Sequence, residues 1–418
     1  MDVGRLRSPM SLTRREVLAA CAAASASLAA KGCAPTRAGA AATPPPAPPP
    51  LAPGPAVPIA LAGVPRGATP ESVAQAVRRA ACAPDDLAWL ARGDTVFVKV
   101  AANSGNGYPA TTDPIAVRAM VELLRERGAG RVIVGDMSGV QAVRFWKDGL
   151  RGSSRELMRE NGIARAAHEA GAELHAFEEA GWDGFFAESP KVAGSWAGPI
   201  MLPAVLREVD HVVLLPRCAR HVLAGSTLAL KAAVGWWRHD SRLEYHRDAA
   251  TFAQKTADAS TVPTILEKQR LVLTSATRVL TTFGPDDGYD HDPEHGLVFA
   301  SPSPVAHDML SLAWLLEGRA ATPESERTGL LDDPNQSGTF VNLANRIVTT
   351  WLGGLGEALR AERLERYDLA TIWDDRVLAR AFQTAGGVPR VELGAVNEHI
   401  PPALLERLAR QVSPSGVG

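Results

Sequence analysis

The chain has 418 residues, with 44 Lys and Arg against 46 Asp and Glu, and a formal net charge of −2. This balance, without a run of basic residues, argues against a nucleic-acid partner. The four cysteines are too widely spaced for a CxxC metal or redox module.

Residues 1–33 contain the parts of a twin-arginine signal peptide in order. Arg14 and Arg15 stand directly before an apolar run, and no residue from Val17 to Ala30 is charged. This run is too short to span a membrane as a stable helix but suits the apolar core of an export signal. We therefore expect the twin-arginine translocase to export the folded protein to the periplasm or the outer face of the cell envelope. The alternative is a surface amphipathic helix with two chance arginines.

The end of this signal has two candidate positions. Cys33 follows a small residue, as in a lipoprotein signal, although Lys31 is unusual so close to such a cysteine. The competing site is the small-residue run at Ala38-Gly39-Ala40. Acylation of Cys33 would tether the protein to the membrane surface through a lipid anchor without a membrane-spanning helix.

A proline-rich segment follows at residues 34–58. Nine of the 15 residues from Pro44 to Pro58 are proline, and such a composition favours an extended conformation and cannot build a core. We expect a disordered linker that holds the following domain away from its anchor.

The rest of the chain is large for one hydrophobic core, which suggests one big α/β domain or two closely packed lobes. We place this α/β domain at residues 59–370 and a C-terminal extension at residues 371–418. Cys82 and Cys218 lie in this part. The sequence leaves open whether they form a disulfide or stay as buried thiols.

The first clear unit begins with a strand at Thr95–Val100. Asp113 then caps a helix that has Pro114 in its first position, the usual chemistry of a helix start. The apolar residues of this helix recur at i, i+3, i+4 and i+7, and a second strand follows at Arg131–Gly135. Strand, helix and strand in this order predict parallel pairing with a right-handed crossover.

The same alternation continues along the chain. Helical patterns are predicted at Ser154–Ala170, Pro203–Glu208, Thr227–Val234, Ser303–Leu316 and Phe340–Arg363. Strands are predicted at Glu173–Phe177, His211–Leu215, Leu271–Thr274 and Leu297–Ala300. The predicted fold class is α/β, with mostly parallel sheet flanked by helices and functional loops beyond the carboxyl ends of the strands.

The densest group of chemically active side chains follows the strand at His211–Leu215. His221 follows this strand, Lys231 lies in an otherwise apolar helix, and His246 comes further on. A lysine among apolar residues has to reach solvent or meet an anion, because burying an amine alone is costly. These three residues and Asp136, which follows the second strand, are the candidate catalytic residues. The alternative is that Lys231 extends to solvent and the histidines are ordinary surface residues.

The loop after the first strand is the candidate cofactor-binding segment. It carries Lys99, Asn103, Thr111 and Thr112 beside a helix N-terminus. Backbone amides, a lysine and hydroxyls suit an anion such as a phosphate or carboxylate. The alternative is an ordinary capped loop between a strand and a helix.

Parallel topology predicts that Asp136, His221 and His246 meet at one edge of the sheet. Side chains of these types could hold a divalent metal or transfer protons. The acidic segment Gly284–His295 also has the composition of a metal loop, although such loops are more often solvated turns. The sequence has no GxSxG, P-loop or HExxH motif, which removes several enzyme classes without excluding an enzyme.

An ordered set of these residues, from about Val96 to Leu316, resembles the family called domain of unknown function 362. The matching positions are Lys99, Asn103, Thr111-Thr112-Asp113-Pro114, Gly135-Asp136, Pro216–His221, Thr227–Lys231, Gly235, His246, Gly284-Pro285, Gly288, Ala300-Ser301 and Asp308. The resemblance implies an α/β fold and supplies no established reaction.

Two departures from the family pattern are evident. Ala219 stands where the family often has a lysine, and the ferredoxin-like cysteine clusters of many members are missing. We therefore expect no iron–sulfur cluster. The leading interpretation is a cell-envelope enzyme or cofactor-dependent protein with a Lys/His/Asp site and a small-molecule ligand. The alternative is a tethered, non-catalytic binding protein for a small anion.

Overall fold

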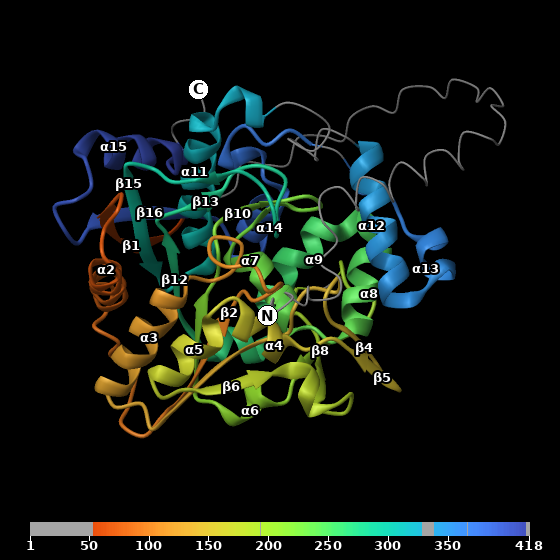
Figure 1. Cartoon of the computed structure of the whole chain (residues 1–418). Coiled ribbons are helices and arrows are strands. Elements are labelled where there is room, and N and C mark those ends of the chain that lie inside the picture. Colours follow the sequence, from red (N-terminus) through yellow and green to blue (C-terminus); the bar gives the residue numbers. More distant parts are fainter. Residues whose placement is uncertain (1–52, 193, 328–337, 366, 415–418) are drawn as a thin grey trace, which may run out of the picture. The chain divides into compact units, whose positions relative to one another are not determined.

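An eight-stranded sheet forms the centre of the fold (Figure 1). Its strands are β1 (Pro53–Pro65), β2 (Thr95–Val100), β3 (Arg131–Asp136), β6 (Glu173–Ala176), β9 (His211–Leu215), β12 (Gln269–Ala276), β15 (His295–Ser301) and β16 (Val388–Ala395). The spatial order is β16-β1-β15-β12-β9-β2-β3-β6. Every neighbouring pair is parallel except β1–β15 and β15–β12. The predicted α/β fold with a mostly parallel sheet is confirmed.

The structure is a computed structural model, and it describes residues 53–192, 194–327, 338–365 and 367–414. The predicted signal peptide, Cys33 and most of the predicted linker lie outside these residues. Residues from Pro53 onward group into one unit, so the described part of the chain is one large domain and not two lobes.

Alternate residues of the strands face opposite sides of the sheet, and both sides are buried. In β2, Val96, Val98 and Val100 belong to the core on one side, whereas Phe97 belongs to a second core on the other. Strands buried on both faces are typical of parallel sheets covered by helices. Lys99 lies on the same side as Phe97, because side chains alternate along a strand.

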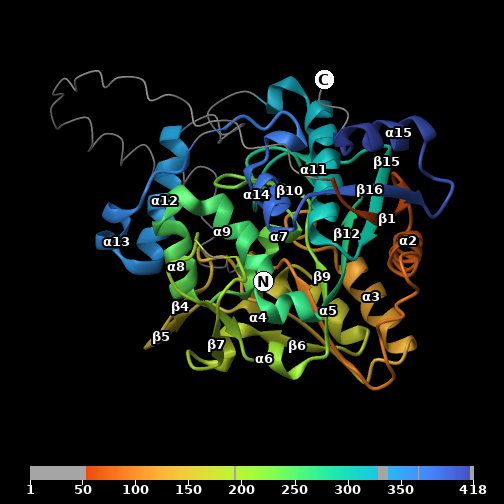
Figure 2. The ribbon, with the colours of Figure 1, turned by 180° about the vertical axis from the view of Figure 1, so that it is seen from behind.

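Two groups of helices cover the sheet (Figures 1 and 2). The core on the first side is completed by α2 (Pro70–Cys82), α3 (Pro114–Glu126), α4 (Ser154–Glu160) and α5 (Ile163–Glu169). On the second side, α11 (Pro304–Ala321) packs against β1, β15 and β16, and α14 (Arg376–Thr384) and α15 (Pro402–Gln411) pack against β16.

Further α-helices and short strands lie in the segments of chain that connect the strands of the large sheet. The helices are α6 (Val205–Glu208), α7 (Ala229–Ala232), α8 (His239–Arg247), α9 (Phe252–Asp258), α10 (Pro263–Lys268), α12 (Gly338–Gly353) and α13 (Leu355–Arg360). The short strands are β4 (Arg144–Trp146), β5 (Gly149–Arg151), β7 (Phe185–Glu188), β8 (Ile200–Pro203), β10 (Ala219–His221), β11 (Gly225–Thr227), β13 (Val279–Leu280) and β14 (Asp290–His291).

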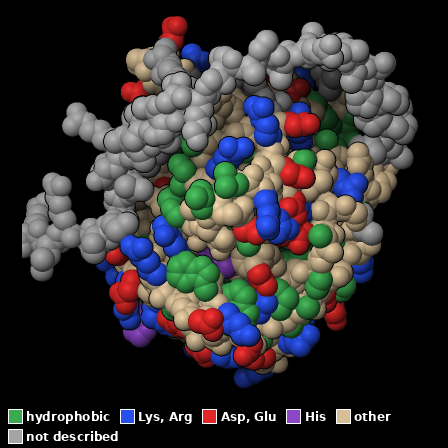
Figure 3. All heavy atoms as spheres, turned by 90° about the vertical axis from the view of Figure 1, so that its right-hand side faces the viewer, with side chains coloured by type: hydrophobic (Ala, Val, Ile, Leu, Met, Phe, Trp, Pro, Cys, Tyr) green, Lys and Arg blue, Asp and Glu red, His purple; other side chains and the backbone are tan. Residues whose placement is uncertain are grey.

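Figure 3 views the side of the molecule that carries α12 and α13, which lie at the right of Figure 1. Apolar side chains are interspersed there with both acidic and basic ones, without a continuous surface of one charge. Leu355 and Leu359 of α13 are exposed. Among the described residues, no helix is both long enough and apolar enough to cross a membrane.

The first strand–helix–strand unit forms as predicted. Asp113 Oδ1 accepts a hydrogen bond from the N–H of Ile115, and Pro114 occupies the first turn of α3. The second carboxylate oxygen of Asp113 accepts a hydrogen bond from the Ser275 hydroxyl at 2.8 Å. One side chain therefore both starts α3 and ties it to the end of β12.

The predicted helix at Ser154–Ala170 is divided into α4 and α5. Gly162, with φ of +87°, lies between them, and Asn161 Oδ1 accepts a hydrogen bond from the N–H of Ile163 at 3.1 Å. A positive φ interrupts a right-handed helix, and glycine adopts it without steric cost.

Two predicted boundaries are wrong. Residues Pro53–Pro58 belong to β1 and not to a linker: their register is with β16 alone, because pairing with β15 begins at Ala60. Prolines are tolerated where a strand has an open side that requires no N–H donor. The predicted extension at 371–418 is part of the domain, since it supplies β16, α14 and α15.

The two cysteines of the domain are both free thiols. Cys82 is partly buried on α2, whereas Cys218 is buried and donates to the carbonyl oxygen of Ser311. Burial raises the pKa of both thiols, so neither is a ready thiolate nucleophile.

Candidate functional site

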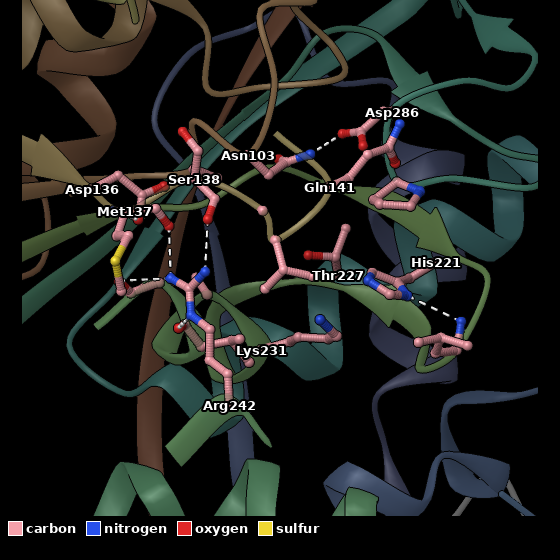
Figure 4. Close-up of a pocket in the computed structure, with 18 of the residues that line it drawn as sticks. Asn103, Asp136, Met137, Ser138, Gln141, His221, Thr227, Lys231, Arg242 and Asp286 are labelled. Atoms are coloured by element: carbon pink, nitrogen blue, oxygen red, sulfur yellow. Dashed lines mark hydrogen bonds between the residues drawn. The ribbon is translucent and has the colours of Figure 1, made fainter. Parts of the chain in front are cut away.

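A cavity of about 200 Å³ lies beyond the carboxyl ends of β2 and β3. Six of the eight candidate catalytic and cofactor-binding residues line it: Lys99, Asn103, Asp136, His221, Lys231 and His246. Figure 4 labels four of these, Asn103, Asp136, His221 and Lys231. The predicted convergence of Asp136, His221 and His246 on one edge of the sheet is therefore present. We call this cavity the central pocket.

Two predicted binding residues do not line the central pocket. Thr112 Oγ1 donates to the carbonyl oxygen of Leu215 at 2.5 Å and accepts from the N–H of Ala101 at 2.8 Å. Thr111 Oγ1 donates to the carbonyl oxygen of Asn106 at 2.9 Å. Both hydroxyls are buried within the loop, so they shape its backbone and do not face a ligand.

Lys99 and Asp136 form a buried ion pair at the floor of the central pocket. The distance from Lys99 Nζ to Asp136 Oδ1 is 2.7 Å, and both side chains are almost completely buried. Lys99 Nζ also donates to the carbonyl oxygens of Val100 and Ala232. Burial lowers the pKa of Lys99, and the neighbouring Asp136 carboxylate counteracts this shift.

Gly235 leaves room for this ion pair. A Cβ atom at position 235 would lie 2.2 Å from Asp136 Oδ1 and 2.4 Å from Lys99 Nζ. The backbone at Gly235 therefore passes so close to the pair that a side chain would have to displace it.

The predicted metal set Asp136, His221 and His246 is not supported. Asp136 Oδ1 already accepts from Lys99 and from the N–H of Met137, and Oδ2 accepts from the N–H of Ala102 at 2.7 Å. Over the described residues, no group of three or more His, Cys, Asp or Glu is arranged to hold a metal ion. Asp136 is a structural carboxylate in this arrangement.

The acidic segment Gly284–His295 does not form a metal loop either. Asp290 pairs with Arg278, and Asp292 lies 3.6 Å from Arg66. Asp286 alone of its acidic residues lines the central pocket, where it accepts a hydrogen bond from the Asn103 side-chain amide.

Lys231 is held in the central pocket by the start of α7. The two carboxylate oxygens of Asp308 accept hydrogen bonds from the N–H groups of Ala229 and Leu230, each at 2.8 Å. These are unpaired donors of the first turn, and a carboxylate there also interacts favourably with the helix dipole. Asp308 thus fixes the turn that carries Lys231.

The amine of Lys231 has no hydrogen-bond or ion-pair partner among the described residues, and Figure 4 shows it pointing into the central pocket. Burial is the main cause that lowers its pKa to about 7, and the nearby Arg217 and Arg242 add to the shift. A substantial fraction of this amine is therefore unprotonated at neutral pH.

Two buried arginines give the central pocket a positive potential. Arg242 donates to the carbonyl oxygens of Met137, Ser138 and Trp237 at 2.6–3.0 Å, and no carboxylate in the described parts of the chain pairs with it. Burial lowers the pKa of Arg242 to about 10, so it remains charged at neutral pH. Arg217 lies 3.7 Å from Asp286.

The two histidines of the central pocket are neutral near pH 7. Burial holds the pKa of His221 well below its usual value, and burial likewise lowers that of His246 to about 3. The positive charge of Lys231 adds to both shifts. These imidazoles therefore do not titrate near neutral pH.

The sequence pattern missed the contribution of α12. Val348 and Trp351 of this helix line the central pocket, and Asn345 contacts His246. Asn345, a polar residue within an apolar helical run, was the available signal of a contact by this helix. Nothing in the sequence indicated that its partner is His246.

The fold and the pocket define an α/β protein with a basic ligand site at the carboxyl edge of its sheet. The chain belongs to the family described as Domain of unknown function (DUF362), whose model matches residues 96–313. This segment contains the pocket-lining residues from Lys99 to Asp286 and ends before α12.

No curated protein matches the chain. Among solved structures, the lactate racemase apoprotein from Thermoanaerobacterium thermosaccharolyticum is similar at 12% identity and a TM-score of 0.36, over 54% of this chain and 51% of that one. A structural-genomics protein from Thermotoga maritima is similar at 14% identity and a TM-score of 0.37, over 62% of this chain and 60% of that one. The chain thus spans about half to three fifths of the length of these two solved structures.

Proposed function

We propose that the protein is an enzyme that binds a small anionic substrate in the central pocket and uses Lys231 as a proton acceptor. The observation that carries the proposal is the amine of Lys231, which points into the pocket without a partner among the described residues. An amine whose pKa is about 7 can take up and return a proton at neutral pH, as general base catalysis requires.

The charges around the central pocket support an anionic substrate. Lys99 and Asp136 neutralise one another, and Asp286 offsets Arg217. Arg242 keeps an unbalanced charge, because its donors are bound to backbone carbonyl oxygens. An anion that enters the pocket supplies the missing negative charge, and its approach raises the proton affinity of Lys231.

The size of the central pocket supports a small substrate. Pockets that enclose drug-sized ligands measure about 300–1,000 Å³, whereas this one measures about 200 Å³. A carboxylate of a few carbon atoms, with a C–H bond made acidic by a neighbouring carbonyl or carboxyl group, fits both the volume and the charge.

A second candidate function is a non-catalytic binding protein for the same anion. It is favoured by Asp136, whose oxygens are already engaged with Lys99 and backbone amides. The pocket then lacks a free carboxylate at the position where the sequence suggested a catalytic one.

We also propose that the protein works in the cell envelope. The support is the paired Arg14 and Arg15 before an uncharged run, followed by a proline-rich segment. Cys33 would supply a lipid anchor.

Hydrogen–deuterium exchange tests the enzyme proposal without knowledge of the net reaction. The purified protein is incubated in D₂O with small 2-oxo, 2-hydroxy and 2-amino carboxylates, and NMR follows loss of the C–H signal at C3 of the 2-oxo acids and at C2 of the others. We expect exchange of at least one compound by the wild type and not by Lys231→Met. Lys147→Met, at an exposed lysine outside the pocket, is the matched control and should retain exchange.

Ligand-observed NMR on the same samples separates the two candidates. Binding without exchange of any compound supports the binding protein and removes the enzyme proposal. If none of the carboxylates binds, the proposal that the central pocket takes a small anionic ligand is contradicted.

A further inference from the structure

One face of α12 meets the central pocket. Asn345, Val348 and Trp351 are spaced at i, i+3 and i+6, so they lie on one side of the helix. Val348 and Trp351 line the pocket, and Asn345 is completely buried. This helix lies beyond residues 96–313, which match the family model.

Asn345 makes two hydrogen bonds to the same histidine. Its Oδ1 lies 2.9 Å from Nδ1 of His246, and its Nδ2 donates to the backbone carbonyl oxygen of His246 at 2.8 Å. The carbonyl oxygen can only accept, so the amide nitrogen has to face it. The amide oxygen is then the group that faces the ring.

This orientation determines which ring nitrogen of His246 carries the proton. Asn345 Oδ1 can only accept a hydrogen bond, so Nδ1 of His246 has to be the donor. In the neutral ring, Nε2 is then left with its lone pair. The ring is kept neutral by burial and by the nearby positive charges of Lys231 and Arg242.

His221 has the opposite arrangement. Its Nδ1 accepts hydrogen bonds from the backbone N–H groups of Leu223 and Ala224, at 3.1 and 3.4 Å. A nitrogen that accepts carries no proton, so the proton of this neutral ring is on Nε2. Figure 4 shows the second ring nitrogen of His221 turned toward Thr227 and Lys231.

We propose that Asn345 is a positioning residue that fixes the tautomer of His246, so that the central pocket offers a hydrogen-bond acceptor on His246 and a donor on His221. A substrate is then oriented with a hydroxyl or amine hydrogen toward His246 and with an oxygen toward His221. This inference uses the pocket of the proposed function but does not depend on catalysis. It assigns a role to α12, which the family segment does not contain.

The tautomers are measured directly by long-range ¹H–¹⁵N NMR of the protein with ¹⁵N-labelled histidine, without any ligand. His221→Gln and His246→Gln spectra assign the two rings. In the wild type we expect Nδ1–H on His246 and Nε2–H on His221. Once the rings are assigned, a wild-type spectrum with the proton of His246 on Nε2 would overturn the proposal, whatever a variant at Asn345 does.

Asn345→Leu removes the acceptor and keeps a side chain of similar size. We expect the proton of His246 to move to Nε2, while His221 is unchanged. If His246 keeps its proton on Nδ1 in this variant, Asn345 does not fix the tautomer.

Asn342→Leu is the matched control on the same helix. Asn342 lies almost one turn earlier and accepts from the N–H of Leu364 at 2.8 Å, and it also donates to the carbonyl oxygen of Leu364. It therefore anchors α12 and makes no hydrogen bond to His246 within the described residues. We expect the wild-type tautomers in this variant. If the proton of His246 moved to Nε2 here as well, a loosened α12 alone would explain the change of tautomer in Asn345→Leu.

The measurement separates this inference from the proposed function. If the tautomers are as expected but no compound exchanges its C–H hydrogen, the role of Asn345 is supported and the enzyme proposal is contradicted. Where a substrate exchanges, we expect Asn345→Leu to lower kcat/KM by about tenfold, the loss that corresponds to about one hydrogen bond.

Discussion

The amine of Lys99 lies 2.7 Å from the carboxylate of Asp136, and both side chains are sealed beneath the backbone of Gly235. The sequence presented both residues as ligand-binding candidates. Because they pair with each other, they form part of the wall of the central pocket. Lys231 lines the same pocket, and its amine has no partner among the described residues.

Replacing Gly235 by alanine should destabilise the protein. The new Cβ would lie 2.2 Å from Asp136 Oδ1, and such overpacking costs about 1–3 kcal/mol or more. Denaturant unfolding measures the loss. Gly356→Ala in α13 is the control, because a Cβ there meets nothing within 4 Å; it should be neutral or slightly stabilising. Equal effects of the two substitutions would contradict the close approach at Gly235.

Asp136→Asn should be more costly than the loss of a surface ion pair. It leaves the charge of Lys99 buried without a counter-charge, which costs about 3–5 kcal/mol in comparable cases. Glu173→Gln breaks the exposed pair with Arg131 and should cost less than about 1 kcal/mol. The free energy of unfolding in urea is measured for both variants, and an equal loss in the two would contradict the expectation.

A double-mutant cycle tests whether this cost arises from the pair. Lys99→Met with Asp136→Leu removes both charges, so the combined loss should be smaller than the two single losses added together. Simple additivity would show that Lys99 and Asp136 act independently.

Lys231→Met should stabilise the protein near neutral pH, and this gain should shrink as the pH rises. The folded-state pKa of Lys231 is about 7, below the ordinary value of 10.5. Between these values only the unfolded chain holds the proton, so the wild type gains stability with rising pH, by up to about 1.4 kcal/mol per unit. Unfolding free energies of both proteins at pH 7 and 9 provide the test. A loss of several kcal/mol in Lys231→Met at pH 7 would mark Lys231 as a structural ion-pair partner instead.

Export should depend on the arginine pair. Replacing Arg14 and Arg15 by lysines keeps the charge but removes the proposed recognition signal, so the precursor should accumulate in the cytoplasm. Cell fractionation with detection of the protein measures this. Arg5→Lys with Arg7→Lys, upstream in the same basic segment, should leave export intact. Normal export of the Arg14/Arg15 variant would remove the localisation proposal.

Membrane attachment should depend on Cys33. If this cysteine is acylated, Cys33→Ala should release the protein from the membrane fraction into the soluble fraction of the envelope. Cys82→Ala, within the folded domain, should leave the distribution unchanged. Retention of the Cys33→Ala protein on membranes would favour cleavage near Ala38-Gly39-Ala40 and a different cause of attachment.

Local chemistry made much of the fold predictable. The cap at Asp113-Pro114 and the apolar run at Thr95–Val100 indicate their structures from neighbouring residues alone, and both are confirmed. Pairing between β1 and β16 was not predictable, because the prolines of Pro53–Pro58 resemble a linker and the partner strand lies at the other end of the chain.

For the candidate site, the sequence predicted which strand ends come together, because the order and direction of the strands determine this. Asp136 and His221 follow strands of one parallel sheet, so their arrival at the same pocket follows from the strand order. The direction of each side chain does not follow from strand order. Thr112 turns toward the backbone of Leu215 instead of the pocket, and Asn345 reaches His246 from a helix outside the recognised pattern.

The position of β1 links the order of synthesis to the completion of folding. This strand is the first of the domain to be translated, yet its two neighbours, β15 and β16, are the last two strands of the sheet in chain order. The edge of β1 that pairs with β16 therefore stays open until Val388–Ala395 has left the ribosome, and unpaired strand edges invite association with other chains. For a protein proposed to cross the membrane already folded, passage can begin only after β16 has emerged and paired, and the proposed signal segment has to stay accessible throughout that delay.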